Sequence, residues 1–170
     1  GLTMECWFRS LGTGGFAMYK GLGDINYRIS LSNNNGYDSL TFMYLTPVGA
    51  LRVAGKRVLS SAVTKGSGWN HIAFSYTAAT GRVRIYYNAQ LMLDTLMVAG
   101  ENLTPNNGPL MVYLAKGCLD ELRIWKNTVR TGSQIKSDMF KGYNYTMAPL
   151  PANVVVYNFD GRMDDVMKPL

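Results

Sequence analysis

Acidic residues are the first candidates for chemistry in this sequence. Asp120 and Glu121 are neighbours within the apolar segment CLDELRIW. Retaining glycoside hydrolysis needs two carboxyl groups about 5–5.5 Å apart, and alternate positions on one strand can supply that spacing. Adjacent strand residues point to opposite faces, so we expect that these two carboxylates do not flank one glycosidic bond. No other carboxylate pair at i, i+2 or i, i+4 lies in a strand-like run. We therefore predict no catalytic residue and no enzyme activity.

The chain has one histidine and two cysteines. No serine or cysteine near His71 marks a nucleophile, so we expect His71 to be a structural residue. Cys6 and Cys118 lie far apart in the sequence, and either one disulfide or two free thiols fits them. These three residues include no closely spaced ligand pair, so no metal site is predicted.

Loops and tyrosines offer candidates for ligand binding. Aspartate and asparagine in loops can bind calcium, but here they show no regular spacing and also suit tight turns. Calcium binding is thus possible but not predicted, and no cofactor is expected. Sugar sites use aromatic faces, and five tyrosines are candidates because they fall in loops or at outward strand positions: Tyr37, Tyr44, Tyr86, Tyr143 and Tyr145. For each of them taken alone, the favoured explanation is that tyrosine suits a half-buried strand face.

Composition excludes several classes of protein. The chain has 170 residues, of which 47% are hydrophobic and 16% charged, and this excludes intrinsic disorder. The net charge is +6, but the basic residues are scattered and form no stripe interleaved with aromatics, so no nucleic-acid partner is predicted. No apolar run approaches the roughly 20 residues that cross a bilayer, so no membrane span is expected.

Period-two alternation dominates the chain and predicts strands with one buried face. The expected strands centre on seven segments, at residues 2–9, 25–31, 40–44, 72–76, 83–87, 117–126 and 154–160. Glycine and asparagine clusters between them predict turns. One short helix is expected after Thr131 or Ser133, either of which can cap it, with Ile135, Met139 and Phe140 on one side.

Three segments in order carry a family resemblance. They are LTMECWFR at residues 2–9, GWNHIAFSY followed by GRVRIYYN at residues 68–88, and CLDELRIW at residues 118–125. Together they resemble the laminin G-like jelly-roll domains of the concanavalin A-like lectin/glucanase superfamily, with pentraxins as relatives. The resemblance implies an all-β fold, namely a two-sheet antiparallel jelly-roll sandwich with one short helix near the C-terminal side.

The resemblance also implies structural roles for the residues that carry it. These residues are Trp7, Trp69, His71, Asp120, Glu121 and Trp125. The tryptophans are expected to anchor the sheet. A carboxylate in an apolar strand needs a partner, and Arg9 or His71 could supply one to Asp120 or Glu121.

Two departures from the family pattern lead to further expectations. The family hairpin turns on Asp-Gly, whereas this chain has Asn88-Ala89-Gln90, so a longer or different turn is expected. The family's usual first strand is missing upstream of residue 2, and VVVYNFDG at residues 154–161 resembles it. We expect residues 154–160 to close one sheet after a proline-containing loop. A single domain over residues 1–170 is predicted.

The resemblance and the lack of catalytic residues together favour a non-catalytic binding module. Carbohydrate is the expected ligand, and an extracellular or cell-surface protein the expected context, with this domain as part of a longer chain. Two alternatives stay open. The first is a protein-interaction or structural domain within a larger protein. The second is a glycoside hydrolase, against which the lack of a carboxylate pair argues. Fold does not fix function, so this step rests on the resemblance.

Overall fold

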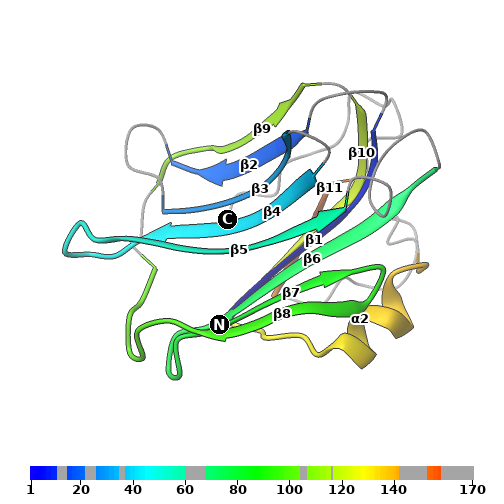
Figure 1. Cartoon of the computed structure of the whole chain (residues 1–170). Coiled ribbons are helices and arrows are strands. Elements are labelled where there is room, and N and C mark those ends of the chain that lie inside the picture. The colour runs from blue at the N-terminus through cyan, green and yellow to red at the C-terminus, as the bar shows by residue number, and fades with distance from the viewer. Residues whose placement is uncertain are drawn as a thin grey trace.

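The computed structural model describes residues 1–10, 15–21, 26–34, 37–59, 68–103, 107–115, 117–141 and 153–157. These residues form two antiparallel β-sheets that face each other, with one short helix beside one of them (Figure 1). Among the described residues, no helix is long and apolar enough to cross a membrane. The predicted all-β sandwich with one short helix is confirmed.

The six-stranded sheet has the order β11-β10-β1-β6-β7-β8. Its strands are β1 Leu2–Ser10, β6 Asn70–Thr77, β7 Arg82–Tyr87, β8 Gln90–Leu96, β10 Gly117–Lys126 and β11 Val154–Tyr157. β1 lies between β10 and β6, so segments that are far apart in the sequence become neighbours. The three segments that carry the family resemblance all lie in this sheet.

The five-stranded sheet has the order β5-β4-β3-β2-β9. Its strands are β2 Phe16–Lys20, β3 Tyr27–Asn34, β4 Tyr37–Leu45, β5 Leu51–Leu59 and β9 Leu110–Leu114. All pairs are antiparallel, and β9 pairs with β2. β9 therefore forms one edge of this sheet and β5 the other.

The core lies between the two sheets because alternation turns one apolar row of each strand inward. Met4, Cys6 and Phe8 of β1 are fully buried, and Ile29 of β3 faces them from the other layer within the same hydrophobic cluster. Burial of such a side chain contributes about 1.5–3 kcal/mol. Both cysteines are free thiols, and burial raises the pKa of the Cys6 thiol.

The structure tests two expectations for individual segments, namely residues 154–160 and the turn after β7. Residues 154–157 form β11 and pair with β10, which confirms for these four residues the expected place in a main sheet. The turn after β7 was expected to be longer or different, and it is not longer, because Tyr87 pairs directly with Gln90 across a two-residue turn. Asn88 and Ala89 have φ of 46° and 61°, the geometry of a tight hairpin turn. Asparagine tolerates this region, and here alanine occupies the position where glycine is usual.

Helix α2, Gly132–Asp138, lies on the outer face of the six-stranded sheet. Thr131 caps it as expected, through a capping box with Gln134. Ile135 is fully buried and packs on Ala73 and Tyr86 of the sheet. The helix ends at Asp138, so the expected position of Phe140 on its buried side is wrong. Phe140 follows the helix and is 77% exposed.

Candidate functional site

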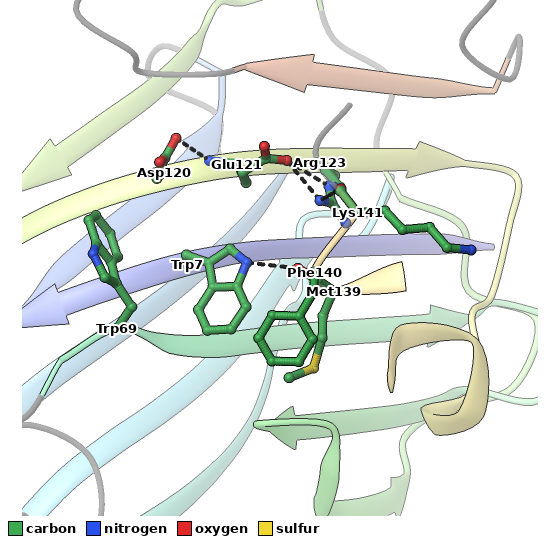
Figure 2. Close-up of a pocket in the computed structure, with 8 residues that line it drawn as sticks. All are labelled: Trp7, Trp69, Asp120, Glu121, Arg123, Met139, Phe140 and Lys141. Carbon is green, nitrogen blue, oxygen red and sulfur yellow. Dashed lines mark hydrogen bonds and ion pairs between the residues drawn. The ribbon is translucent and has the colours of Figure 1, made fainter. Parts of the chain in front are cut away.

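A β-bulge in β10 creates the candidate site. Glu5 pairs with Arg123, but Trp7 already pairs with Asp120, so β10 has one residue more than β1 at this point. Glu121 takes a φ of 49°, which is rare for a residue other than glycine. A bulge interrupts the alternation of side chains along a strand. Asp120 and Glu121 therefore both lie on the outer side of the sheet and line one cavity (Figure 2).

This result corrects the expectation that Asp120 and Glu121 point to opposite faces. That expectation assumed a regular strand, whereas β10 has a bulge at Glu121 that interrupts the alternation. For Glu121 the expected partners, Arg9 or His71, are also corrected. Glu121 is bound by Arg123, whose Nη2 lies 2.7 Å from Oε2. Oδ1 of Asp120 accepts a hydrogen bond from the backbone N–H of Glu121 at 2.8 Å.

The cavity has a volume of about 490 Å³ and lies between the sheet and the chain that follows α2. The sheet side contributes Trp7, Trp69, Asp120, Glu121 and Arg123, and the segment after the helix contributes Met139, Phe140 and Lys141. A volume of this size suits a small-molecule ligand or a few units of a longer chain.

Aromatic rings form much of the cavity wall. Trp7 contacts Phe140, with ring centroids 5.3 Å apart, and meets His71 edge-on at 5.2 Å. Trp69 lies just before β6 and is 42% exposed. The guanidinium of Arg9 lies over its ring, 5.6 Å from the centroid. Trp69 and Phe140 thus present large aromatic surfaces to solvent at the cavity (Figure 2).

Two side chains of the sheet hold the segment after the helix in place. Trp7 Nε1 donates to the carbonyl oxygen of Met139 at 2.9 Å. Arg123 donates from Nη1 to the carbonyl of Asp138 at 3.0 Å and from Nη2 to the carbonyl of Lys141. Because Arg123 also binds Glu121, one buried guanidinium links both walls of the cavity.

A buried charged cluster lies beneath the cavity and the helix. Glu5 is fully buried, and its Oε1 accepts hydrogen bonds from Arg130 Nη1 and from Trp125 Nε1. Arg123 Nη1 lies 3.6 Å from the same oxygen. Burial raises the pKa of Glu5, while Arg130, Trp125 and Arg123 lower it. Arg130 also stacks on the ring of Trp125, 4.3 Å from the centroid.

His71 lies beside this cluster on β6 and is 1% exposed. Burial, with further contributions from Arg123 and Arg130, lowers its pKa to about 3. His71 is therefore neutral at physiological pH. Its Nδ1 is buried and has no hydrogen-bond partner within the described part of the chain. Its structural role stays a prediction.

Two of the tyrosines predicted to bind ligand, Tyr44 and Tyr86, do not line this cavity. Tyr44 is fully buried in the core, where its hydroxyl donates to Glu101 Oε2 at 2.9 Å, so its expected outward position is wrong. Tyr86 is 3% exposed and lies beneath α2, so neither ring can stack on a ligand in this structure. The side chain of Tyr37, and all of Tyr143 and Tyr145, lie outside the described residues.

Sequence reasoning did not single out several residues of the site. The sequence pattern places Phe140 only on one side of the expected helix, and it assigns no site role to Arg123 or Lys141. Glu5 and Arg123 were visible within the quoted strand segments, and a charged residue in each of two apolar strands is the signal that could have paired them. For Lys141 the sequence contains no such signal. Of the described residues, no three of the metal-binding types lie together.

Comparison with known proteins now identifies the family. Residues 1–136 match a laminin G-like family model described as the concanavalin A-like lectin/glucanases superfamily. The chain belongs to this superfamily. The family resemblance of the three strand segments is thereby confirmed. No curated protein sequence matches the chain.

Solved structures show how widely this lectin/glucanase fold is shared. A heptameric SAP-like pentraxin from Limulus polyphemus has a TM-score of 0.59 and 13% identity, over 92% of this chain and 79% of the pentraxin. A Bacteroides ovatus protein, provisionally described as carbohydrate-binding, has a TM-score of 0.59 and 18% identity, over 94% of this chain and 45% of that one.

A leech intramolecular trans-sialidase in complex with 2,7-anhydro-Neu5Ac has a TM-score of 0.55 and 15% identity, over 84% of this chain and 24% of that one. The chain thus spans less than half of the Bacteroides and leech proteins. These identities establish the fold alone. Because binding proteins and an enzyme share this fold, superfamily membership does not decide the activity.

Proposed function

We propose that this chain is a non-catalytic carbohydrate-binding module of an extracellular or cell-surface protein, and that the cavity beside Trp69 is its ligand site. One observation carries the proposal: solvent-exposed aromatic rings and two carboxylates share one cavity on the outer face of the sheet. Aromatic faces can stack on the apolar face of a sugar ring, and carboxylate oxygens accept hydrogen bonds from hydroxyl groups. The Bacteroides protein with the same fold supports this choice of ligand.

The arrangement of Glu121 supports binding rather than hydrolysis. Its Oε2 accepts hydrogen bonds from both Nε and Nη2 of Arg123, at 3.3 and 2.7 Å. A hydrolytic carboxyl group must exchange a proton or attack the sugar during the reaction. Here Arg123 holds the carboxylate in place. Bound oligosaccharides are therefore expected to stay intact, which mass spectrometry after long incubation checks.

Removing the exposed indole should weaken sugar binding. We expect Trp69→Ala to weaken the affinity for the best-binding glycan at least about tenfold, because the stacking surface is lost. Isothermal titration calorimetry measures this after a glycan array, run with and without calcium, has selected the glycan. Tyr113→Ala is the control, since Tyr113 is an even more exposed aromatic, at 64%, on the other sheet. A wild-type domain that binds no glycan in either condition would contradict the proposed function.

A second candidate function is protein interaction, and the feature that favours it is strand β9. Four of its five residues are exposed apolar side chains, with Val112 at 41% and Tyr113 at 64%. The edge strands β5 and β8 carry charge, namely Arg52 and Lys56 on β5 and Asp94 on β8, whereas β11 is uncharged but largely buried. Charged edges resist edge-to-edge pairing, and an uncharged edge permits it. A second copy of this chain is the partner that offers the same uncharged edge.

A cysteine placed at the centre of β9 tests this second candidate. In antiparallel pairing of two β9 strands about Val112, the two copies of residue 112 face each other at a distance that a disulfide can span. We expect Val112→Cys, in a Cys118→Ser background, to form disulfide-linked dimers. Val53→Cys on β5, 54% exposed, should stay monomeric. Equal cross-linking of both variants, seen on a non-reducing gel, would reject pairing through β9.

A further inference from the structure

Three of the four side chains with N–H donors in the described cavity lining already bind groups of the protein, and Trp69 is the fourth. Arg123 has a side chain that is 1% exposed, and its bonds go to Glu121 and to two backbone carbonyls. Trp7 Nε1 donates to the carbonyl of Met139. Lys141 Nζ lies 2.6 Å from Oδ1 of Asp138. A ligand entering the cavity therefore meets few donors that are ready to bind it.

Acceptors at the same cavity stay accessible. The side chain of Glu121 is 19% exposed, and its Oε1 receives no hydrogen bond from any residue that the structure describes. Asp120 is partly exposed. A carboxylate offers about four acceptor positions, so each can bind a ligand beyond its partners within the protein. The cation that balances Glu121, Arg123, is enclosed and cannot bind the ligand directly.

We propose that this cavity selects saccharides that carry a free ammonium group, accepts neutral ones more weakly and rejects acidic ones. This inference rests on the proposed function and specifies its ligand class. An amino sugar brings a charged donor to Asp120 and Glu121 while its ring stacks on Trp69. A neutral sugar brings hydroxyl donors without charge. A carboxylate or sulfate on the sugar meets like charge at Asp120 and Glu121. Among the described lining residues, the one cation that it can reach is Lys141, which is paired with Asp138.

The net charge of the chain distinguishes this proposal from non-specific electrostatic attraction. At +6, non-specific attraction favours acidic glycans. The cavity favours the opposite order, so a preference for amino sugars cannot come from the overall charge. Arg9 lies over Trp69 outside the cavity lining and adds to the attraction for acidic glycans.

Four oligosaccharides of equal length test the inference by calorimetry: those of glucosamine, N-acetylglucosamine, glucose and glucuronic acid. We expect the glucosamine oligomer to bind at least about tenfold more tightly than the N-acetylated one, and the glucuronic acid oligomer to bind most weakly. An acidic oligomer that binds as tightly as the glucosamine oligomer would overturn the inference while leaving the proposed function standing. Binding of none of the four would also overturn the inference, whereas the proposed function fails only if the glycan array shows no binding.

Variants that lack one of the two carboxylate charges test whether the selectivity arises at this cavity. Glu121→Gln and Asp120→Asn keep shape and remove charge, so each should reduce the preference for the glucosamine oligomer severalfold. Asp94→Asn is the matched control, because Asp94 is a carboxylate on β8 outside the cavity lining. Melting temperatures of all three variants show whether the fold persists. An unchanged ranking in a folded Asp120→Asn protein, with Glu121→Gln also unchanged, would contradict the inference.

Discussion

Replacing Arg130 with methionine is expected to lower the free energy of unfolding by about 3–5 kcal/mol, because a buried carboxylate loses a charged partner. Arg130 is 3% exposed, and Nη1 binds the fully buried Glu5. The substitution leaves Glu5 with Trp125 and the more distant Arg123. It also removes the bond from Arg130 to Asp138 and the stacking on Trp125. A domain of this size is usually stable by about 5–15 kcal/mol in total, so the loss is a large share.

Urea denaturation followed by tryptophan fluorescence measures this change. Arg82→Met is the matched control, since Arg82 forms an ion pair with Asp94 but is 45% exposed, and exposed pairs contribute about 1 kcal/mol or less. Adding Glu5→Gln to Arg130→Met should restore part of the stability, because no unpaired charge is then buried. Arg130→Lys keeps the charge and should fall in between, which gives a folded variant if methionine is not tolerated. Equal losses in Arg130→Met and Arg82→Met would contradict the role of the cluster.

Strand positions could be predicted because alternation records burial directly. In β1, Met4, Cys6 and Phe8 face the core, as their spacing indicates. The same rule places Tyr44 inward with Phe42, so the prediction that Tyr44 occupies an outward strand position did not follow the alternation. Burial of its hydroxyl leaves no unsatisfied polar group, because the hydroxyl donates a hydrogen bond to Glu101. Tyrosine type alone therefore does not locate a ligand site.

The cavity itself could not be predicted from the sequence, for two physical reasons. The bulge at Glu121 shifts the alternation by one residue, and no glycine in CLDELRIW marks it. The helix stops at Asp138, which turns Phe140 out beside Trp7 instead of onto the sheet. Both events depend on contacts between segments far apart in the sequence, among them the hydrogen bonds of Arg123 to the chain after the helix.

Acidification is expected to destabilise the domain through its single histidine. His71 has an ordinary pKa near 6.5 when unfolded and about 3 when folded, so between these values the unfolded chain binds more protons than the folded one. Stability therefore falls as the pH falls through about 6.5. From pH 6.5 to 4.5 the loss is about 2.5 kcal/mol, because each full pH unit contributes about 1.36 kcal/mol and the unfolded histidine is only half protonated at pH 6.5. Glu5, whose pKa is raised by burial, acts in the opposite direction over this range.

Comparison with a variant isolates the histidine contribution from that of Glu5. His71→Gln cannot titrate, so its stability should fall less than that of the wild type between pH 6.5 and 4.5, by about 2–3 kcal/mol. Urea denaturation at both pH values measures the difference. Because the chain has only one histidine, its proton resonance is unambiguous by NMR. The folded protein should show no titration of that resonance from pH 8 to 4.5. A midpoint near 6.5 would mean that His71 is solvated, and the buried position between Trp7 and the arginines would then be wrong.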